Sequence, residues 1–182
     1  MKTLKTIQTL AKIGEVLSCI AFIFACIGFG GSVVGALSAA FGGGFAIKLG
    51  GVTIYDLFGG ARYSELEGVC AALLGWMIVC AGEAVVAKFA ELYFKRELAA
   101  GTPFTLSGAK ELTRLGVLTL AVPTGCAVLA AVVSGIAASF LRAGEAMDVH
   151  FDNGASIALG VMFLVAALLC RLGAEQAQVR QA

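Results

Sequence analysis

The chain has 182 residues, of which 59% are hydrophobic and 14% are charged, and its formal net charge is +1. Soluble domains carry about 25% charged residues, and a soluble protein of this size has too high a surface-to-volume ratio to hide so much apolar surface. The near-zero net charge also argues against a nucleic-acid-binding protein. The composition therefore predicts a protein whose main solvent is lipid.

Four long uncharged stretches divide the sequence. In chain order they cover 16–47, 68–82, 115–141 and 153–170. About 20 apolar helical residues cross a hydrocarbon core about 30 Å thick. We therefore predict one four-pass domain over 1–182, with helices at about 13–41, 68–94, 115–141 and 155–172. The first stretch is far longer than the roughly 7–15-residue core of a signal peptide, which favours a retained membrane helix.

The two halves of the chain are similar. Residues 10–14, Leu-Ala-Lys-Ile-Gly, open the first helix, and residues 112–116, Leu-Thr-Arg-Leu-Gly, open the third. An outer loop and a second helix follow in each half, which indicates a parallel repeat. The expected fold class is thus an all-α membrane protein with two similar helix-loop-helix halves.

Basic residues are concentrated on one side of the predicted bilayer. Ten of the 13 Lys and Arg residues belong to this set: Lys2, Lys5, Lys12, Lys88, Lys95, Arg96, Lys110, Arg114, Arg171 and Arg180. The opposite side keeps Lys48, Arg62 and Arg142 beside several acidic residues. Because an excess of basic residues marks the cytoplasmic side, we predict cytoplasmic N- and C-termini and two acidic outer loops.

The outer loops contain short alternating patterns typical of strands. Residues 45–49 and 52–55 flank a Gly-Gly pair, which predicts a β-hairpin. Residues 147–151 also alternate and predict a third strand, so that a small extracytoplasmic sheet would cap the helices. Three ligand-type side chains share one face of that strand: Asp148, His150 and Asp152. Their spacing is too wide for one tetrahedral metal, which favours a solvated acidic face.

Small residues recur at four-residue spacing and so share helix faces. They are Gly31 and Gly35 in the first helix, Ala127, Ala131 and Gly135 in the third, and Gly160 in the fourth. Lipid gives helices little hydrophobic drive to associate, so close packing of small faces holds membrane bundles together. These faces predict packing within the chain, with a homo-oligomer contact as the alternative.

Glu83 lies about 22 Å of helical rise beyond the start of the second uncharged stretch, near the inner edge of the hydrocarbon. Glu15, Arg114 and Arg171 are expected at a similar depth. Charges there face the bundle interior or a partner, so we predict an inner ionic layer in which the two acids pair with the two arginines. The alternative is an ion or proton site at Glu83. Pro123, inside the third helix, is predicted to kink it.

Motifs of enzymes are absent from the sequence. It contains no H-E-x-x-H, no G-x-S-x-G and no phosphate-binding loop ending in Gly-Lys-Ser/Thr. The six cysteines lie in the apolar stretches and form no C-x-x-C pair, which argues against a zinc or redox motif. We therefore expect no catalytic residues, no cofactor and no metal.

The segment before the third helix has its own local pattern. Gly101 and Pro103 are expected to break the preceding helix, and Thr105 or Ser107 to cap the next one. Phe104 is expected to anchor the turn at the membrane interface. Lys110 and Arg114 are then expected one turn apart at the lipid head groups, where basic side chains extend toward water.

The same segment resembles a bacterial family of four-helix membrane proteins, the domain of unknown function 2975. Members carry Gly-x-Pro-Phe-Thr and then a basic stretch that ends with Arg, Ile or Leu, and Gly. The matching residues here are Gly101, Pro103, Phe104, Thr105, Arg114, Leu115 and Gly116. The stretch 173–177 is similar to the family's C-terminal end but departs from its acidic pattern. The resemblance implies a bacterial cytoplasmic membrane, no enzymatic activity and, because similar proteins are often encoded beside a small helix-turn-helix regulator, a regulatory role.

Two functional hypotheses follow. The first is a non-enzymatic regulatory or accessory membrane protein that acts through its helix faces and basic inner loop. Its partners would be the lipid bilayer, another membrane or regulatory protein, or a second copy, but not nucleic acid. The alternative is a small oligomeric transporter or channel for an ion or small molecule that uses Glu83 and Pro123. A continuous polar cavity between the helices that reaches Glu83 would favour transport, and a dry, tightly packed bundle would favour the accessory role.

Overall fold

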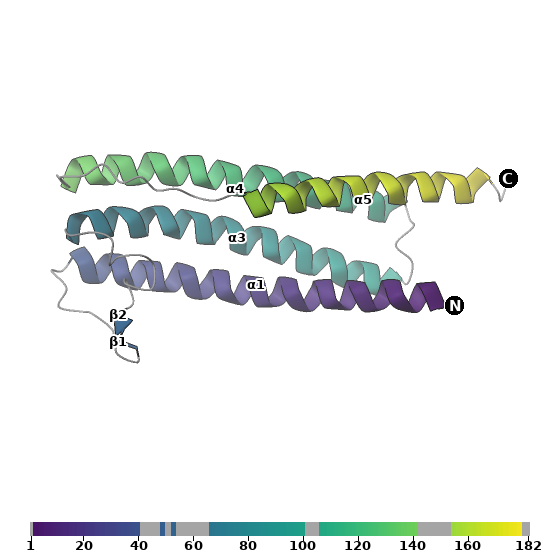
Figure 1. Cartoon of the computed structure of the whole chain (residues 1–182), viewed down its shortest axis with the longest axis horizontal. Helices are drawn as coiled ribbons and strands as arrows, with labels where there is room; N and C mark the ends of the chain where they lie inside the picture. Colours follow the sequence, from purple (N-terminus) through teal and green to yellow (C-terminus); the bar gives the residue numbers. More distant parts are fainter. Residues whose placement is uncertain are drawn as a thin grey trace. The chain divides into compact units, whose positions relative to one another are not determined.

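The computed structural model describes residues 2–40, 48–49, 52–53, 66–100, 106–141 and 154–179, and the side chains of 8–37, 68–99, 106–141 and 154–176. Four long helices dominate this part of the chain (Figure 1). They are α1 (Lys2–Ala40), α3 (Leu66–Ala100), α4 (Leu106–Leu141) and α5 (Gly154–Val179). All four are long and apolar enough to cross a membrane, so the predicted all-helical class with four long apolar helices is confirmed.

The helices extend beyond the apolar segments from which they were predicted. α1 begins at Lys2 rather than near residue 13, and α3 continues to Ala100 rather than ending near residue 94. α4 begins at Leu106 and α5 continues to Val179. These extensions contain Lys, Glu, Gln, Arg, Leu and Ala, which favour helix in water as well as in lipid. Membrane thickness limits the apolar run of a helix, whereas local propensity determines where the helix ends.

Large apolar side chains cover the outside of the helices. Phe24 is 69% exposed, Phe140 is 83% exposed and Met162 is 67% exposed. Only 11% of the apolar span of α1 is buried, against 44% of the span of α3. Contiguous exposed apolar surface is unfavourable in water, whereas lipid solvates it. Within the described residues, α3 is the most buried helix and its neighbours present their apolar sides outward.

The predicted outer sheet is reduced to a minimal pairing. β1 (Lys48–Leu49) and β2 (Val52–Thr53) are antiparallel, with Lys48 opposite Thr53 and Leu49 opposite Val52. The predicted third strand at 147–151 lies outside the described residues. A cap over the helices is therefore not supported. Strands of only two residues each present too little apolar surface to hold a sheet against a helix bundle.

The chain forms two compact units, each with its own core. The first unit contains residues 1–23, 83–123 and 153–182, which include the start of α1, the second part of α3, the start of α4 and the whole of α5. Within it, the start of α1, the end of α3, the start of α4 and the end of α5 lie at one end (Figure 1). Its core joins α3, α4 and α5 through buried Ala90, Tyr93, Leu112, Leu115 and Ala167.

Close helix contacts in the first unit occur where one helix has no side chain. A Cβ atom on Gly14 of α1 would lie 2.7 Å from the ring of Phe94 on α3. A Cβ atom on Gly160 of α5 would lie 2.6 Å from Cγ of Leu120 and 3.1 Å from the carbonyl oxygen of Gly116, both on α4. Gly160 is therefore a packing residue, as predicted. Small residues let helices approach where lipid supplies little drive for association.

The second unit contains residues 24–82 and 124–152. Gly35 of α1 is buried and approaches α3, because a Cβ atom added to it would lie 2.9 Å from Cδ1 of Leu73. Gly75 of α3 similarly faces Ala130 and Ser134 of α4. Leu73 is only 1% exposed, so the α1–α3 contact of this unit is tightly packed and Gly35 serves as predicted.

Within the described residues, one face that was predicted to pack is exposed. The stripe Ala127, Ala131 and Gly135 of α4 was expected to pack within the chain, but Ala131 and Gly135 are exposed and Ala127 is half-buried. No atom of another described segment lies within 4 Å of a Cβ added to Gly135. The buried face of α4 is instead Ala130, Ser134 and Ala138. Gly31 of α1 is half-buried beside fully buried Ser32.

Candidate functional site

The first unit encloses a cavity of about 330 Å³ to which all four helices contribute. We name it the Glu83 cavity. Its lining residues are Leu17, Ser18 and Ala21 of α1, Glu83, Val86, Ala87 and Ala90 of α3, Thr119 and Pro123 of α4, and Ser156, Leu159 and Phe163 of α5. Small-molecule sites generally span about 300–1,000 Å³. The Glu83 cavity is thus large enough for a small organic ligand.

Glu83 is the only charged side chain among the described residues that line the cavity. It is exposed and makes no salt bridge with any described residue. A carboxylate at membrane depth without a partner is costly, and such groups usually mark a ligand or ion pathway. Glu83 therefore lies where the cavity opens, with its negative charge unmatched within the described part of the chain.

Two hydroxyl groups of the cavity wall, those of Ser18 and Thr119, present acceptors rather than donors. Ser18 donates its hydroxyl hydrogen to the carbonyl of Gly14 at 2.8 Å, and Thr119 donates to the carbonyl of Leu115 at 2.8 Å. Each hydroxyl has one hydrogen to donate and two lone pairs to accept. Their hydrogens are already engaged with their own helices, so what they offer to a ligand is oxygen lone pairs.

Pro123 adds a further acceptor to the same wall. Proline has no backbone N–H, so the helical hydrogen bond from residue 123 to the carbonyl of Thr119 cannot form. Pro123 is buried, and α4 continues through it from Leu106 to Leu141. The carbonyl of Thr119 is thus left without its usual helical donor. Pro123, which was predicted to kink α4, therefore also removes the helical hydrogen-bond donor of a carbonyl next to the cavity.

The rest of the cavity wall is apolar. Val86, Leu159 and Phe163 come from two different helices and supply most of its bulky side chains. The combination of one carboxylate, several acceptor oxygens and an apolar wall suits a ligand with a positive charge, hydrogen-bond donors and a hydrocarbon part. A bare metal ion would leave most of this volume unused.

The predicted ionic layer does not form as expected. Arg171 donates from Nε to Oε1 of Glu175, one turn away on α5, at 2.9 Å. Arg114 lies over the ring of Phe89, with its Cζ 5.7 Å from the ring centroid. Within the described residues, neither Glu15 nor Glu83 pairs with an arginine. Arg171 thus pairs with a residue one turn along its own helix, and Arg114 contacts an aromatic ring on α3. Neither arginine neutralises Glu83, so the charge of Glu83 remains available to the cavity.

A different ionic cluster lies further along α3. Glu91 is 4% exposed and forms salt bridges with Lys88, at 2.9 Å, and with Lys95. Lys88 also lies 5.1 Å from the ring centroid of Phe22 on α1. The spacings i−3 and i+4 around Glu91 are the signal that would have predicted this cluster from the sequence. It neutralises the buried carboxylate and links α3 to α1.

Several other residues singled out in the sequence lie where the structure gives no description. The inner-loop residues Gly101, Pro103, Phe104 and Thr105 lie outside the described part of the chain, as do Asp148, His150 and Asp152. Over the described ranges, no group of three His, Cys, Asp or Glu side chains is placed to hold a metal ion. None of the six cysteines forms a disulfide. The Glu83 cavity is consequently the strongest candidate site.

The fold and the cavity define a class: a membrane-embedded bundle of four long apolar helices with an acidic cavity in one of its two units. Comparison with protein-family models, with curated proteins and with solved structures yields no match. Function therefore has to be argued from the residues of the cavity themselves.

Proposed function

We propose that this protein binds a small organic cation in the Glu83 cavity and carries it across a membrane. The observation that supports this function most directly is a carboxylate without a salt bridge among the described residues, on a cavity where the Ser18 and Thr119 hydroxyls offer acceptor oxygens. A protonated amine matches both features, because its N–H groups donate and its charge is opposite to that of Glu83. The apolar wall takes its hydrocarbon part.

The proposal corresponds to the transporter alternative rather than to the accessory role. A continuous polar cavity between the helices that reaches Glu83 is the feature expected of a transporter, and a dry, tightly packed bundle is expected of an accessory protein. The first unit contains a cavity that reaches Glu83, and most of its wall is apolar. An accessory role remains a second proposal, supported by the exposed basic residues Arg96, Lys110 and Arg114 at the loop-facing ends of α3 and α4.

The proposed setting is a bacterial cytoplasmic membrane, with both termini in the cytoplasm. The distribution of basic residues supports this orientation. The start of α1 and the end of α5 lie at the same end of the first unit, which is compatible with it (Figure 1). The resemblance to the domain of unknown function 2975 supports the bacterial origin. The outward-facing stripe of Ala131 and Gly135 supports a homo-oligomer, since no described residue of the chain covers Gly135.

A binding titration with phenethylammonium tests the function. The purified protein in detergent is titrated with this cation and with the uncharged analogue 3-phenylpropanol, and heats of binding are measured. We expect Glu83→Gln to weaken phenethylammonium binding about 10- to 100-fold, the effect of losing a hydrogen bond to a charged group. Binding of 3-phenylpropanol is expected to change little.

Glu15→Gln is the matched control. Glu15 is also an acidic residue of a membrane helix without a salt bridge among the described residues, but it does not line the Glu83 cavity. This variant is expected to bind phenethylammonium like the wild type. Equal affinity of the wild type and Glu83→Gln for the cation would rule out the proposed site and favour the accessory role. Uptake of the cation into reconstituted vesicles then distinguishes transport from binding alone.

A further inference from the structure

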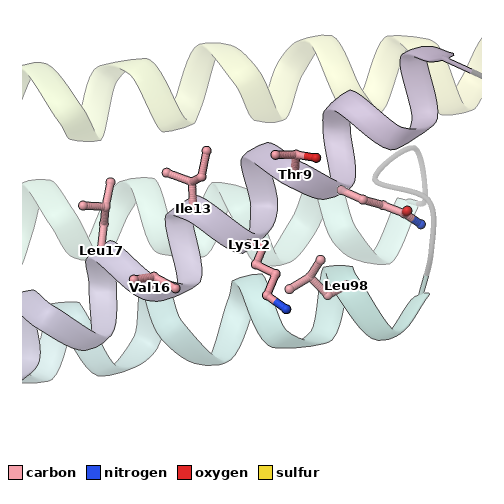
Figure 2. Close-up of a pocket in the computed structure, with 7 residues that line it drawn as sticks. Thr9, Lys12, Ile13, Val16, Leu17 and Leu98 are labelled. Atoms are coloured by element: carbon pink, nitrogen blue, oxygen red, sulfur yellow. The ribbon is translucent and has the colours of Figure 1, made fainter.

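A second hollow lies on the first unit, at the N-terminal part of α1. It has a volume of about 730 Å³ and is lined by Gln8, Thr9, Lys12, Ile13, Val16 and Leu17 of α1 and by Leu98 of α3. We name it the Lys12 groove. Figure 2 shows the side chain of Lys12 extending toward Leu98, with Ile13 and Leu17 further along α1. The groove is independent of the proposed transport function.

The chemistry of the groove changes along its length. Its first lining residues, Gln8, Thr9 and Lys12, are polar or basic, and the residues that follow on α1, Ile13, Val16 and Leu17, are all apolar. A helix rises 1.5 Å per residue, so the two parts together extend about 14 Å along α1. A ligand that fits the groove therefore has an anionic or polar head at one end and a hydrocarbon chain at the other.

The charge of Lys12 selects the head group. Lys12 is exposed and forms no salt bridge within the described residues. Glu15, the acidic residue nearest to it along α1, forms no salt bridge with it. An ammonium group beside a membrane helix end attracts anionic lipid head groups, at about 1 kcal/mol for each basic residue near the surface. The free positive charge is thus available to a phosphate.

We propose that the Lys12 groove binds an anionic phospholipid from the leaflet that surrounds the N-terminal end of α1. Its phosphate lies at Lys12, with Gln8 beside it, and an acyl chain runs over Ile13, Val16 and Leu17. Leu17 lines both the Lys12 groove and the Glu83 cavity. The bound acyl chain would therefore cover one wall residue of that cavity from outside.

Native mass spectrometry of the protein released from mixed micelles tests the site. The micelles contain phosphatidylglycerol and phosphatidylcholine in equal amounts, and the ratio of the two retained lipids is measured. We expect phosphatidylglycerol to be retained preferentially by the wild type. Lys12→Gln is expected to lower that preference about fivefold, which is the effect of one basic residue on an anionic lipid.

Lys110→Gln is the matched control, because Lys110 is an exposed lysine of α4 without a salt bridge in the described part of the chain and outside the groove. It is expected to keep the wild-type preference. Val16→Ser is expected to reduce retention of both lipids, because it removes apolar contact with the chain. Soluble glycerol phosphate is expected to displace neither lipid.

Three results of the lipid measurements would overturn the proposal. They are an unchanged preference in Lys12→Gln, an equal loss in Lys110→Gln, and displacement of phosphatidylglycerol by glycerol phosphate. A protein dimer in which lipid is absent from the groove would also overturn it, by identifying a second copy as the occupant. Melting temperatures in phosphatidylcholine alone check that the variants are folded. Phenethylammonium binding to Lys12→Gln is also measured and is expected to be normal. This control separates a failure of the lipid site from a failure of the function proposed for Glu83.

Discussion

Gly160 and Gly135 are both small residues on membrane helices, but their surroundings are opposite. A Cβ atom on Gly160 would lie 2.6 Å from Cγ of Leu120 and 3.1 Å from a backbone oxygen. A Cβ atom on Gly135 would meet no atom of another helix within 4 Å in the part of the chain that the structure describes. Replacing glycine with alanine at position 160 therefore tests the cost of overpacking, and the same replacement at position 135 tests the gain in helix propensity alone.

We predict that Gly160→Ala lowers the stability of the protein by about 1–3 kcal/mol, the usual effect of overpacking a close contact. Gly135→Ala is expected to be neutral or to stabilise by up to about 1 kcal/mol, because alanine favours helix over glycine. Melting temperatures of the two variants in detergent give the comparison. A loss of stability in Gly135→Ala equal to that in Gly160→Ala would show that the exposed stripe is covered, by a second copy of the chain.

At the scale of the element, Pro123 determines what α4 contributes to the Glu83 cavity. Replacing it with alanine restores a backbone N–H, which then bonds the carbonyl of Thr119 and withdraws that acceptor from a ligand. We predict that Pro123→Ala raises the melting temperature and weakens phenethylammonium binding about two- to tenfold, the worth of one hydrogen bond. Both effects are measured on the same purified sample.

Pro123→Gly is the control for the volume of the proline ring. It also restores the N–H and leaves more space in the cavity than alanine does, so equal binding by the two variants shows that the side-chain volume left at position 123 matters little. Glycine is unfavourable in a helix interior by about 1 kcal/mol relative to alanine, and the melting temperature of Pro123→Gly is expected to be the lower of the two. If Pro123→Ala binds the cation as tightly as the wild type, the carbonyl of Thr119 is not a ligand.

For the whole molecule, the central prediction is its orientation. Basic residues near short loops remain cytoplasmic because translocating them is unfavourable, so both termini are expected in the cytoplasm. Green fluorescent protein fused to residue 182 is expected to fluoresce in bacterial cells, whereas alkaline phosphatase fused at the same position is expected to be inactive. The two reporters inserted after residue 59 are expected to give the reverse result, and active phosphatase at the C-terminus would contradict the proposed orientation.

The existence and type of the four helices could be read from the sequence, because a bilayer demands long apolar helices whatever they pack against. Residues 16–47 and 115–141 contain no charge at all, and no tertiary contact is needed to interpret them. The residues at which the helices begin and end were less predictable. The start of α1 at Lys2 and the end of α3 at Ala100 depend on polar residues that favour helix without marking the membrane.

Only the tertiary structure decided which faces and which charges meet. The stripes Ala127–Ala131–Gly135 and Ala130–Ser134–Ala138 are equally small and have the same spacing, so the sequence cannot tell which one packs against α3. Similarly, any acid near the inner end could have paired with Arg114 or Arg171. The sequence by itself determined that this chain is solvated by lipid, because that follows from summed hydrophobicity. The cavity around Glu83 depends on the rotation of four helices about their own axes, which no local pattern specifies.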